Sequence, residues 1–282
     1  MNDPLPADYK EPDSLTEIQE ITTVIKEQGM DWLTNFYVDE GRLERWIRKH
    51  QAYYYATEQT LLFLRQRRGF WQLYLTSSNA KDLNDCLRKF LSDVHETVVT
   101  DILGDAPVLR EALQAGKWQP YLILQRIVKL NPPGQEAKPV ADEFYARPGE
   151  EQQIMDMLAE DIDPLGEQVP DLDEIAERIA AREVLAIRDE ATGKLKAFFS
   201  FARQGSTVTG RFLVTRRKYR EEGWGVDLSD MYFALHADAR RILGWVRADK
   251  KRNLKLYELQ GYKKDRLRDE VFIFKGADAC NG

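Results

Sequence analysis

Residues 214–228 read VTRRKYREEGWGVDL. The apolar run at 208–215 is typical of a buried strand, and residues 223–240 are typical of a helix. Between them, Gly223 and Gly225 stand at the predicted helix start, shortly after the four cationic side chains of residues 216–220. The first turn of a helix leaves N–H groups without partners, and glycine lets an anion approach them closely. The stretch therefore predicts a phosphate-binding turn, and the alternative is an ordinary bend that uses its glycines for curvature.

The elements around this turn repeat along the chain. In the second half we predict helices at 149–160, 171–182 and 251–259, and strands at 143–147, 183–188, 195–203, 242–248 and 271–275. The last five elements of the second half are strand 208–215, helix 223–240, strand 242–248, helix 251–259 and strand 271–275. The first half repeats this order with strand 70–76, helix 80–95, strand 97–103, helix 108–115 and strand 121–130. Residues 41–57 are predicted as helix.

A Pro/Gly-rich stretch, NPPGQEAKP at 131–139, separates the two halves, because it can continue neither a helix nor a central strand. We therefore predict two similar domains, at 1–135 and 136–282. The 282 residues carry a net charge of -6 and no apolar run that approaches the ~18 residues of a membrane span. The start of the chain is acidic where a signal peptide is basic, so we expect a cytoplasmic protein.

Cysteine, histidine and charge give weaker indications. Cys86 and Cys280 lie far apart, and the three histidines show no metal spacing, so neither a disulfide nor a metal site is predicted. Residues 150–177 hold eleven acids and no Lys or Arg, while residues 240–268 hold eleven cations against three acids. These blocks are either ligand surfaces or solvated helix faces.

Two motifs carry a resemblance to a known family. Residues 220–225, REEGWG, fit Arg-x-x-Gly-x-Gly after a central strand, with Val214 and Tyr219 upstream where the family pattern has them. Residues 256–262, LYELQGY, fit a second motif on the following helix. In these features the chain resembles the GNAT superfamily of acyl-coenzyme A N-acyltransferases. The resemblance implies an α+β fold of two GNAT-like domains, each with a mixed, mostly antiparallel central sheet flanked by helices.

The resemblance also implies a site for acetyl-coenzyme A. The strands 208–215 and 242–248 would splay apart, the coenzyme arm would pair with the first, and an N–H near Val214 would polarise the thioester carbonyl. Tyr257 would protonate the departing thiolate; its alternative role is aromatic packing. The residues expected to bind the coenzyme are Leu213, Val214, Thr215, Arg220, Glu221, Glu222, Gly223, Trp224 and Gly225.

The chain departs from the family pattern at three points. Lys250 and Asn253 replace the usual Asn and Ala before the tyrosine, and Lys250 could instead face the coenzyme phosphates. The strand at 208–215 contains no carboxylate, so the general base stays unassigned. In the first half, residues 77–82 read SSNAKD, without glycine or arginine, and are typical of a helix cap. We therefore expect a degenerate, non-catalytic first copy.

The expected activity is the transfer of an acetyl group from acetyl-coenzyme A to a primary amine. The acids of 150–177 favour a cationic acceptor, either a small-molecule amine or a basic peptide. Two alternatives stay open, a non-catalytic GNAT-like binding protein and an aminoacyl-tRNA-dependent transferase. Neither a membrane nor nucleic acid is expected as a partner; the acceptor, the acyl preference and the oligomeric state are left open.

Overall fold

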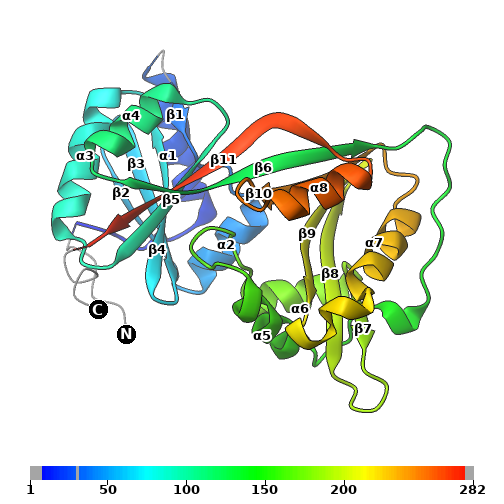
Figure 1. The fold of residues 1–282 in the computed structure, drawn as a ribbon. Coiled ribbons are helices and arrows are strands. Elements are labelled where there is room, and N and C mark those ends of the chain that lie inside the picture. The colour runs from blue at the N-terminus through cyan, green and yellow to red at the C-terminus, as the bar shows by residue number, and fades with distance from the viewer. Residues whose placement is uncertain (1–7, 30–31, 277–282) are drawn as a thin grey trace. The chain divides into compact units, whose positions relative to one another are not determined.

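The computed structural model describes residues 8–29 and 32–276. The chain divides into two compact units, each with its own core (Figure 1). The first unit consists of Met1–Leu124 and Leu267–Gly282, and the second is Gln125–Arg266.

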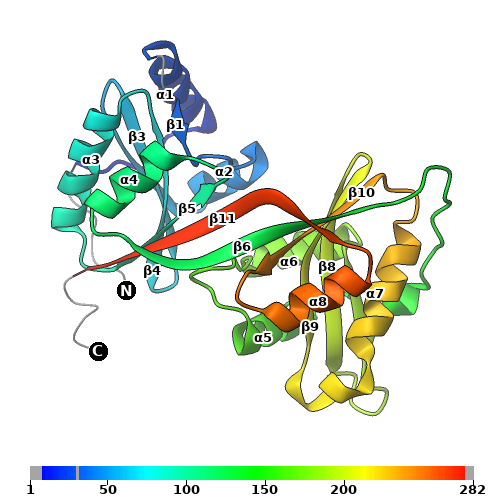
Figure 2. The ribbon, with the colours of Figure 1, turned by 45° about the horizontal axis from the view of Figure 1, so that its top comes forward.

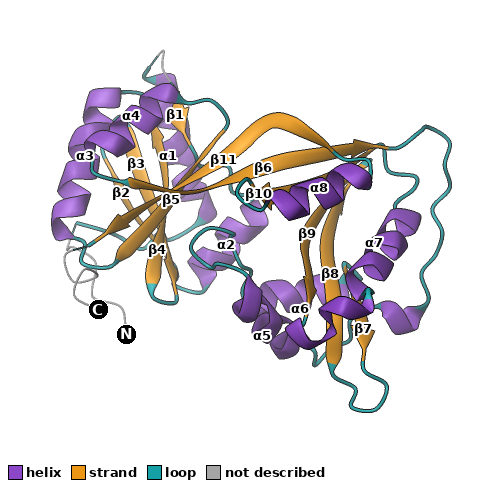
Figure 3. Cartoon of the chain, viewed as in Figure 1, coloured by secondary structure: helices purple, strands orange, loops and turns teal. Residues whose placement is uncertain are grey.

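The first unit is a twisted sheet with helices on both faces (Figure 3). Its strands pair in the order β2-β3-β4-β5-β11, and β1 pairs separately with β4. The helices are α1 (Leu15–Glu27), α2 (Glu40–Arg48), α3 (Ala80–Asp93) and α4 (Pro107–Ala115). The strands are β1 (Leu33–Thr34), β2 (Ala52–Ala56), β3 (Thr60–Arg67), β4 (Phe70–Ser77), β5 (Thr97–Leu103) and β11 (Lys263–Lys275).

Two hydrophobic clusters cover the two faces of this sheet. Side chains of α3 and α4 pack with one face of β3, β4 and β5, and Trp71 and Phe90 are fully buried there. Side chains of α1 and α2 pack on the opposite face, around Trp46 and Phe63. Because both faces are covered, β4 is buried along its whole length, which is why its sequence is an apolar run rather than an alternating one.

The second unit has the same kind of architecture. Its strands pair in the order β11-β6-β10-β9-β8-β7. The helices are α5 (Glu151–Asp161), α6 (Leu172–Ala180), α7 (Trp224–Leu235) and α8 (Lys251–Leu259). The strands are β6 (Gln119–Leu130), β7 (Val184–Arg188), β8 (Leu195–Gln204), β9 (Thr207–Thr215) and β10 (Arg241–Arg247).

Successive side chains of β8 point to opposite faces of this sheet, and each face packs against different helices. Phe198 packs with α5 and α6, whereas Phe199 and Phe201 pack with α7 on the other face. Phe199 and Phe201 are two residues apart and therefore face the same side, while the register shift between Ser200 and Phe201 leaves Arg211 of β9 as an extra residue. The start of α6 is fixed by a capping box between Asp171 and Glu174.

The last strands of the two repeats are exchanged. β6 follows α4 of the first unit in the chain but pairs with β10, while β11 follows α8 of the second unit but pairs with β5 (Figure 2). The β11–β5 register runs from Asp269↔Leu103 to Lys275↔Thr97. The units therefore divide at residues 124 and 266, which differs from the division expected at residue 135, because each long strand has residues in both units.

The α+β fold class is confirmed, and most predicted elements lie where the periodicity placed them. Two predictions were wrong. Residues 41–57 are not one helix, because α2 ends at Arg48 and a strand, β2, follows. Residues 143–147 are not a strand; Asp142–Phe144 is a 3₁₀ helix, and only Tyr145 forms a bridge, to Leu185. The predicted helix at 223–240 ends at Leu235.

Within the described ranges, no helix has both the length and the apolar character that crossing a membrane requires.

Candidate functional site

The strands β9 and β10 are paired over a short stretch only. Their parallel register covers Arg241↔Thr207, Ile242↔Val208 and Leu243↔Thr209. Residues 210–215 of β9, called here the open edge, pair with β8 but have no register with β10 in the described part of the chain. The splay expected between these two strands is therefore present. It leaves main-chain N–H and C=O groups available to an extended ligand.

Strand alternation identifies the groups on this open edge. The N–H of Arg216 donates to the carbonyl of Lys196 on β8 at 2.9 Å. Successive residues of a strand point their main-chain groups to opposite sides, so Thr215 and Leu213 face away from β8. Val214 has its main-chain groups directed toward β8, and its side chain is buried among α5 and α6. Leu213 and Thr215, rather than Val214, supply the amides of the open edge.

The glycine turn (residues 216–225) continues directly from the open edge. A 3₁₀ helix, Arg217–Glu222, leads to Gly223, whose φ of +86° is in the left-handed region that favours glycine. Gly223 is the N-cap of α7, and a Cβ built on it would meet no atom within 4 Å. A Cβ on Gly225 would lie 3.4 Å from the Thr215 hydroxyl oxygen. At Gly223 no neighbouring atom of the described residues crowds the N–H groups at the start of α7, as an anion-binding site requires.

Acids of α5 partner several cations of the glycine turn. Arg220 forms an ion pair with Asp161 and donates from Nε to the carbonyl of Thr215 at 3.3 Å. Arg216 donates to Glu160 at 3.0 Å. A phosphate bound at the turn would therefore compete with Asp161 for Arg220.

The remaining predicted residues of the turn differ in exposure. Glu221 is exposed and Glu222 accepts a hydrogen bond from the indole N–H of Trp224 at 2.7 Å. Lys196 lies 3.5 Å from the Glu222 carboxylate and over the Trp224 ring. Glu222 and Trp224 therefore brace the turn from one side, which is a structural role that the motif did not indicate.

The acidic stretch at 150–177 is not a uniform free surface. Glu150 is held by Arg188 at 2.6 Å, and Glu160 and Asp161 are held by the glycine turn. Asp171 and Glu174 cap α6. These carboxylates stabilise the unit, so the local charge available to attract a cationic acceptor is smaller than the sequence count suggests.

Tyr257 lies on α8 in an aromatic cluster with Tyr232 and Tyr262. Its ring stands nearly perpendicular to that of Tyr262, with centroids 5.4 Å apart. Burial raises the pKa of the Tyr257 phenol above its usual value, so the hydroxyl keeps its proton at neutral pH. The residue can therefore serve both roles considered for it, packing α8 and donating a proton.

The corresponding gap in the first unit is filled by the chain itself. β4 and β5 pair only at Trp71↔Val98 and Gln72↔Val99, yet β1 pairs with the far end of β4. The Asn35 side chain then bridges the two strands. It accepts from the N–H of Leu75 at 2.7 Å, and donates to the Thr100 hydroxyl and the Asp101 carbonyl, both at 2.8 Å.

The helix start in the first unit is closed as well. The Asn79 side chain accepts hydrogen bonds from the N–H groups of Lys81 and Asp82 at 2.9 and 3.1 Å. This confirms the helix cap predicted from the sequence. Both features that the second unit leaves open, a strand edge and a helix start, are occupied internally in the first unit.

Glu167, which precedes α6, is one of the eleven acids of 150–177, but the sequence did not indicate its environment. Its carboxylate is half-buried and lies 3.9 Å from Arg247 at the end of β10. Burial raises its pKa, and Arg247 opposes that shift. No local pattern signals this environment, because it depends on a loop meeting a strand 80 residues further along.

The cysteine and metal predictions concern residues outside this site. Cys86 is buried, and burial raises the pKa of its thiol to about 11, which suits an unreactive side chain. Cys280 lies outside the described residues. In the ranges 8–29 and 32–276, no three His, Cys, Asp or Glu side chains gather as metal ligands.

Comparison with solved structures identifies the fold. A GCN5-related N-acetyltransferase from Sphaerobacter thermophilus matches with a TM-score of 0.57 and 11% identity, over 96% of this chain and 97% of the other. A tandem GNAT protein from the clavulanic acid biosynthesis pathway matches at 0.56 and 11%, over 93% and 95%. A GNAT-family acetyltransferase from Colwellia psychrerythraea matches at 0.55 and 11%, over 95% and 99%.

The chain therefore has the GNAT fold over nearly its whole length, in agreement with the resemblance that the two motifs carry. No family model matches the sequence, and no curated protein does.

Proposed function

We propose that the second unit is an N-acetyltransferase that moves an acetyl group from acetyl-coenzyme A to a primary amine. The observation that carries the proposal is the contrast between the units. The open edge of β9 leads into a bare helix start at Gly223, whereas β1, Asn35 and Asn79 fill the same features in the first unit. One acyl donor would therefore bind per chain, in the second unit.

The residues present fit such a donor. The amides of Leu213 and Thr215 would pair with the extended pantetheine arm, and the N–H groups at the start of α7 would face the pyrophosphate. When bound, the coenzyme supplies an activated thioester. Tyr257, held as a neutral phenol, would donate its proton to the departing sulfur. An acceptor amine, with an ordinary pKa of about 10.4, must lose a proton before it attacks.

A calorimetric titration with acetyl-coenzyme A tests the binding part. The wild type should bind one equivalent, and Gly223→Val should lose at least about tenfold in affinity, because a branched side chain would cover the N–H groups. The matched control is Gly205→Val, since Gly205 also has a positive φ and open surroundings but lies in the β8–β9 turn. Equal affinities in the two variants would show that the coenzyme does not bind at the Gly223 helix start.

A transfer assay that detects free coenzyme A, run over cationic, neutral and anionic primary amines, tests the reaction. A cationic amine is expected as the best acceptor, with an apparent affinity that falls as salt rises, because exposed acids of α5 and α6 remain. Tight coenzyme binding without turnover on any amine would favour the non-catalytic binding protein instead. Absence of coenzyme binding would overturn the proposal.

A further inference from the structure

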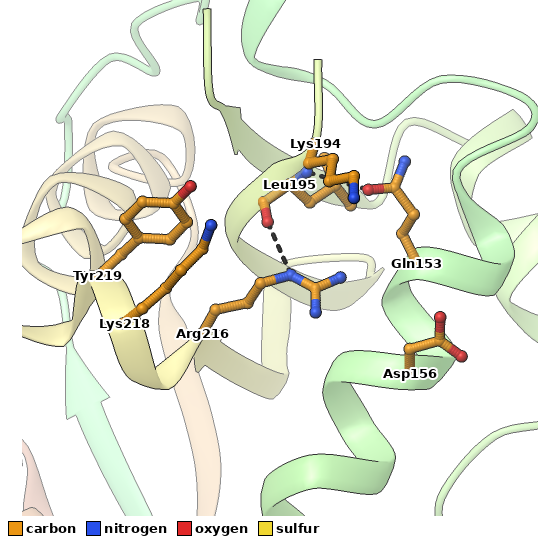
Figure 4. A pocket seen from close by; sticks show the side chains of 7 residues that line it. All are labelled: Gln153, Asp156, Lys194, Leu195, Arg216, Lys218 and Tyr219. Atoms are coloured by element: carbon orange, nitrogen blue, oxygen red, sulfur yellow. Dashed lines mark hydrogen bonds between the residues drawn. The ribbon is translucent and has the colours of Figure 1, made fainter. Parts of the chain in front are cut away.

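A polar cavity of about 410 Å³ lies beside the glycine turn, on the side of α5 (Figure 4). It is bounded by α5, the turn before β8, and the first part of the glycine turn. The lining residues are Gln153, Asp156, Lys194, Leu195, Arg216, Lys218 and Tyr219.

Two of the three cations around this cavity, Lys194 and Lys218, differ from the arginines of the glycine turn in having no carboxylate partner within residues 8–29 and 32–276. Arg217 and Arg220 both pair with Asp161 elsewhere on the turn. By contrast, neither Lys194 nor Lys218 has a carboxylate oxygen within 4.0 Å among the residues that the structure describes. Lys218 instead lies over the Tyr219 ring at 4.3 Å. Two exposed ammonium groups therefore share one opening without neutralisation.

Arg216 supplies a cation that is already positioned. Its Nε donates to the carbonyl of Leu195 at 2.9 Å, and its Nη1 donates to Glu160 at 3.0 Å. Its side chain is only 20% exposed, so little conformational entropy remains to be lost on binding. Figure 4 shows the guanidinium reaching into the space between Leu195 and Asp156. A fixed guanidinium flanked by exposed lysines is an arrangement that suits phosphate oxygens.

One acid faces this group of cations. Asp156 is exposed, and its carboxylate accepts a hydrogen bond from Gln152 at 2.8 Å, on its own helix. With Glu160, the partner of Arg216, counted as well, three cations face two carboxylates, which leaves a positive excess of one at the cavity. The volume is large enough for a phosphate together with the sugar that carries it.

We propose that this cavity binds a phosphate monoester through Arg216, Lys194 and Lys218. The phosphate has two possible sources, the 3′-phosphate of coenzyme A and a separate phosphate-bearing ligand. The first source rests on the proposed function, whereas the second does not depend on it. In either case the site is distinct from the helix start at Gly223, because its cations belong to the turn before β8 and to the first residues of the glycine turn.

Titrations of the full chain with coenzyme A, 3′-dephospho-coenzyme A and inorganic phosphate separate the sources. If the coenzyme is the source, coenzyme A binds about tenfold or more tightly than its 3′-dephospho form. The double variant Lys194→Gln, Lys218→Gln then abolishes this difference and leaves the affinity for 3′-dephospho-coenzyme A unchanged. If the ligand is separate, the two coenzymes bind equally, and inorganic phosphate binds to the wild type but not to the double variant.

Two further variants test whether the effect depends on the charge at this cavity. Asp156→Asn should tighten phosphate binding, because it removes the opposing charge, and Lys81→Gln, an exposed lysine of the first unit, should change nothing. The proposal is overturned if coenzyme A and its 3′-dephospho form bind equally and inorganic phosphate does not bind. It is also overturned if the double variant behaves as the wild type. Either result would leave acetyl-coenzyme A binding at Gly223 intact, so the two proposals can fail separately.

Discussion

Tyr257 is a partly buried phenol whose raised pKa keeps it protonated, and this defines a test of its role. We expect Tyr257→Phe to lower kcat by about 10²- to 10⁴-fold while the affinity for acetyl-coenzyme A stays nearly constant. The reason is that proton donation to a leaving thiolate matters in the transition state and not in the bound ground state. Steady-state kinetics with a true acceptor, alongside calorimetry, make the measurement.

Tyr262→Phe is the matched control for that experiment. Tyr262 belongs to the same aromatic cluster, and its ring contacts that of Tyr257. A loss of turnover that is the same in both variants would mean that the cluster acts by packing, and Tyr257 would leave the mechanism.

His236, at the end of α7, carries a pH dependence of stability. The ring is buried between Phe201 and Tyr232, and burial, followed by the Arg203 guanidinium, lowers its pKa to about 4, while Asp238 opposes the shift. The folded state therefore holds a neutral imidazole that the unfolded chain would protonate near pH 6.5. The stability from this group is complete above pH 6.5 and is lost as the pH falls toward 4.

The size of this effect follows from the shift. A difference of about 2.5 pKa units corresponds to about 3 kcal/mol in the free energy of unfolding. Urea unfolding between pH 7 and 4 should show that loss in the wild type and a flatter curve in His236→Gln. His50→Gln, which changes a largely exposed histidine, should keep the wild-type slope. A parallel slope in His236→Gln would refute the assignment.

At the scale of elements, β1 and Asn35 close the first unit. Asn35→Ala would leave the Leu75 N–H, the Asp101 carbonyl and the Thr100 hydroxyl without these hydrogen bonds, in a buried place. We expect a loss of about 2 to 4 kcal/mol in the free energy of unfolding. Asn253→Ala, on the exposed face of α8, is the control and should stay within about 0.5 kcal/mol. Denaturant titration measures both, and equal stabilities would contradict the bridging role.

Elements with a clear local period could be predicted from the sequence. α8 and β5 have the predicted bounds, because each combines a regular apolar pattern with turn residues at its ends. The β2–β3 hairpin was missed because it has little alternation: both of its strands are rich in large apolar residues, and β3 is buried on both faces. On a single helix over 41–57, Tyr54 would share a face with Leu43 and Trp46; it does pack with them, but from β2.

Only the local features of the candidate site could be predicted from the sequence. The position of Gly223 and Gly225 at a helix start follows from local sequence and is seen in the structure. The ion-pair partners of the nearby arginines do not follow from local sequence, since the pairs Arg220–Asp161 and Arg216–Glu160 join segments more than 50 residues apart. Local patterns indicate where a charge lies along an element but not what the fold brings beside it.

At the scale of the whole molecule, the exchanged strands decide which pieces can fold. The cores of the second unit lie entirely within residues 125–266. We therefore expect the fragment 125–266 to unfold cooperatively in urea. Fragment 136–282, cut at the proline-rich stretch, should not unfold cooperatively, because it lacks β6, which is one of the two neighbours of β10 and carries the core residue Ile127.

The first unit supplies the complementary experiment. Fragment 1–124 lacks β11, including Phe272, which is buried in its core. It should show no cooperative transition, whereas the same fragment joined to residues 267–282 by a flexible linker should regain one. Circular dichroism during urea titration distinguishes these outcomes. Cooperative unfolding of fragment 1–124 alone would mean that β11 is dispensable.

The strand exchange also sets the order in which a ribosome can complete the molecule. Residues 267–275 leave the exit tunnel after every other described strand, so the nascent first unit carries β5 as a bare edge throughout the synthesis of the second. Domains made first ordinarily finish folding first. Here the amino-terminal unit waits for the last strand to be translated, and during that interval its unpaired edge is open to pairing with strands of other chains.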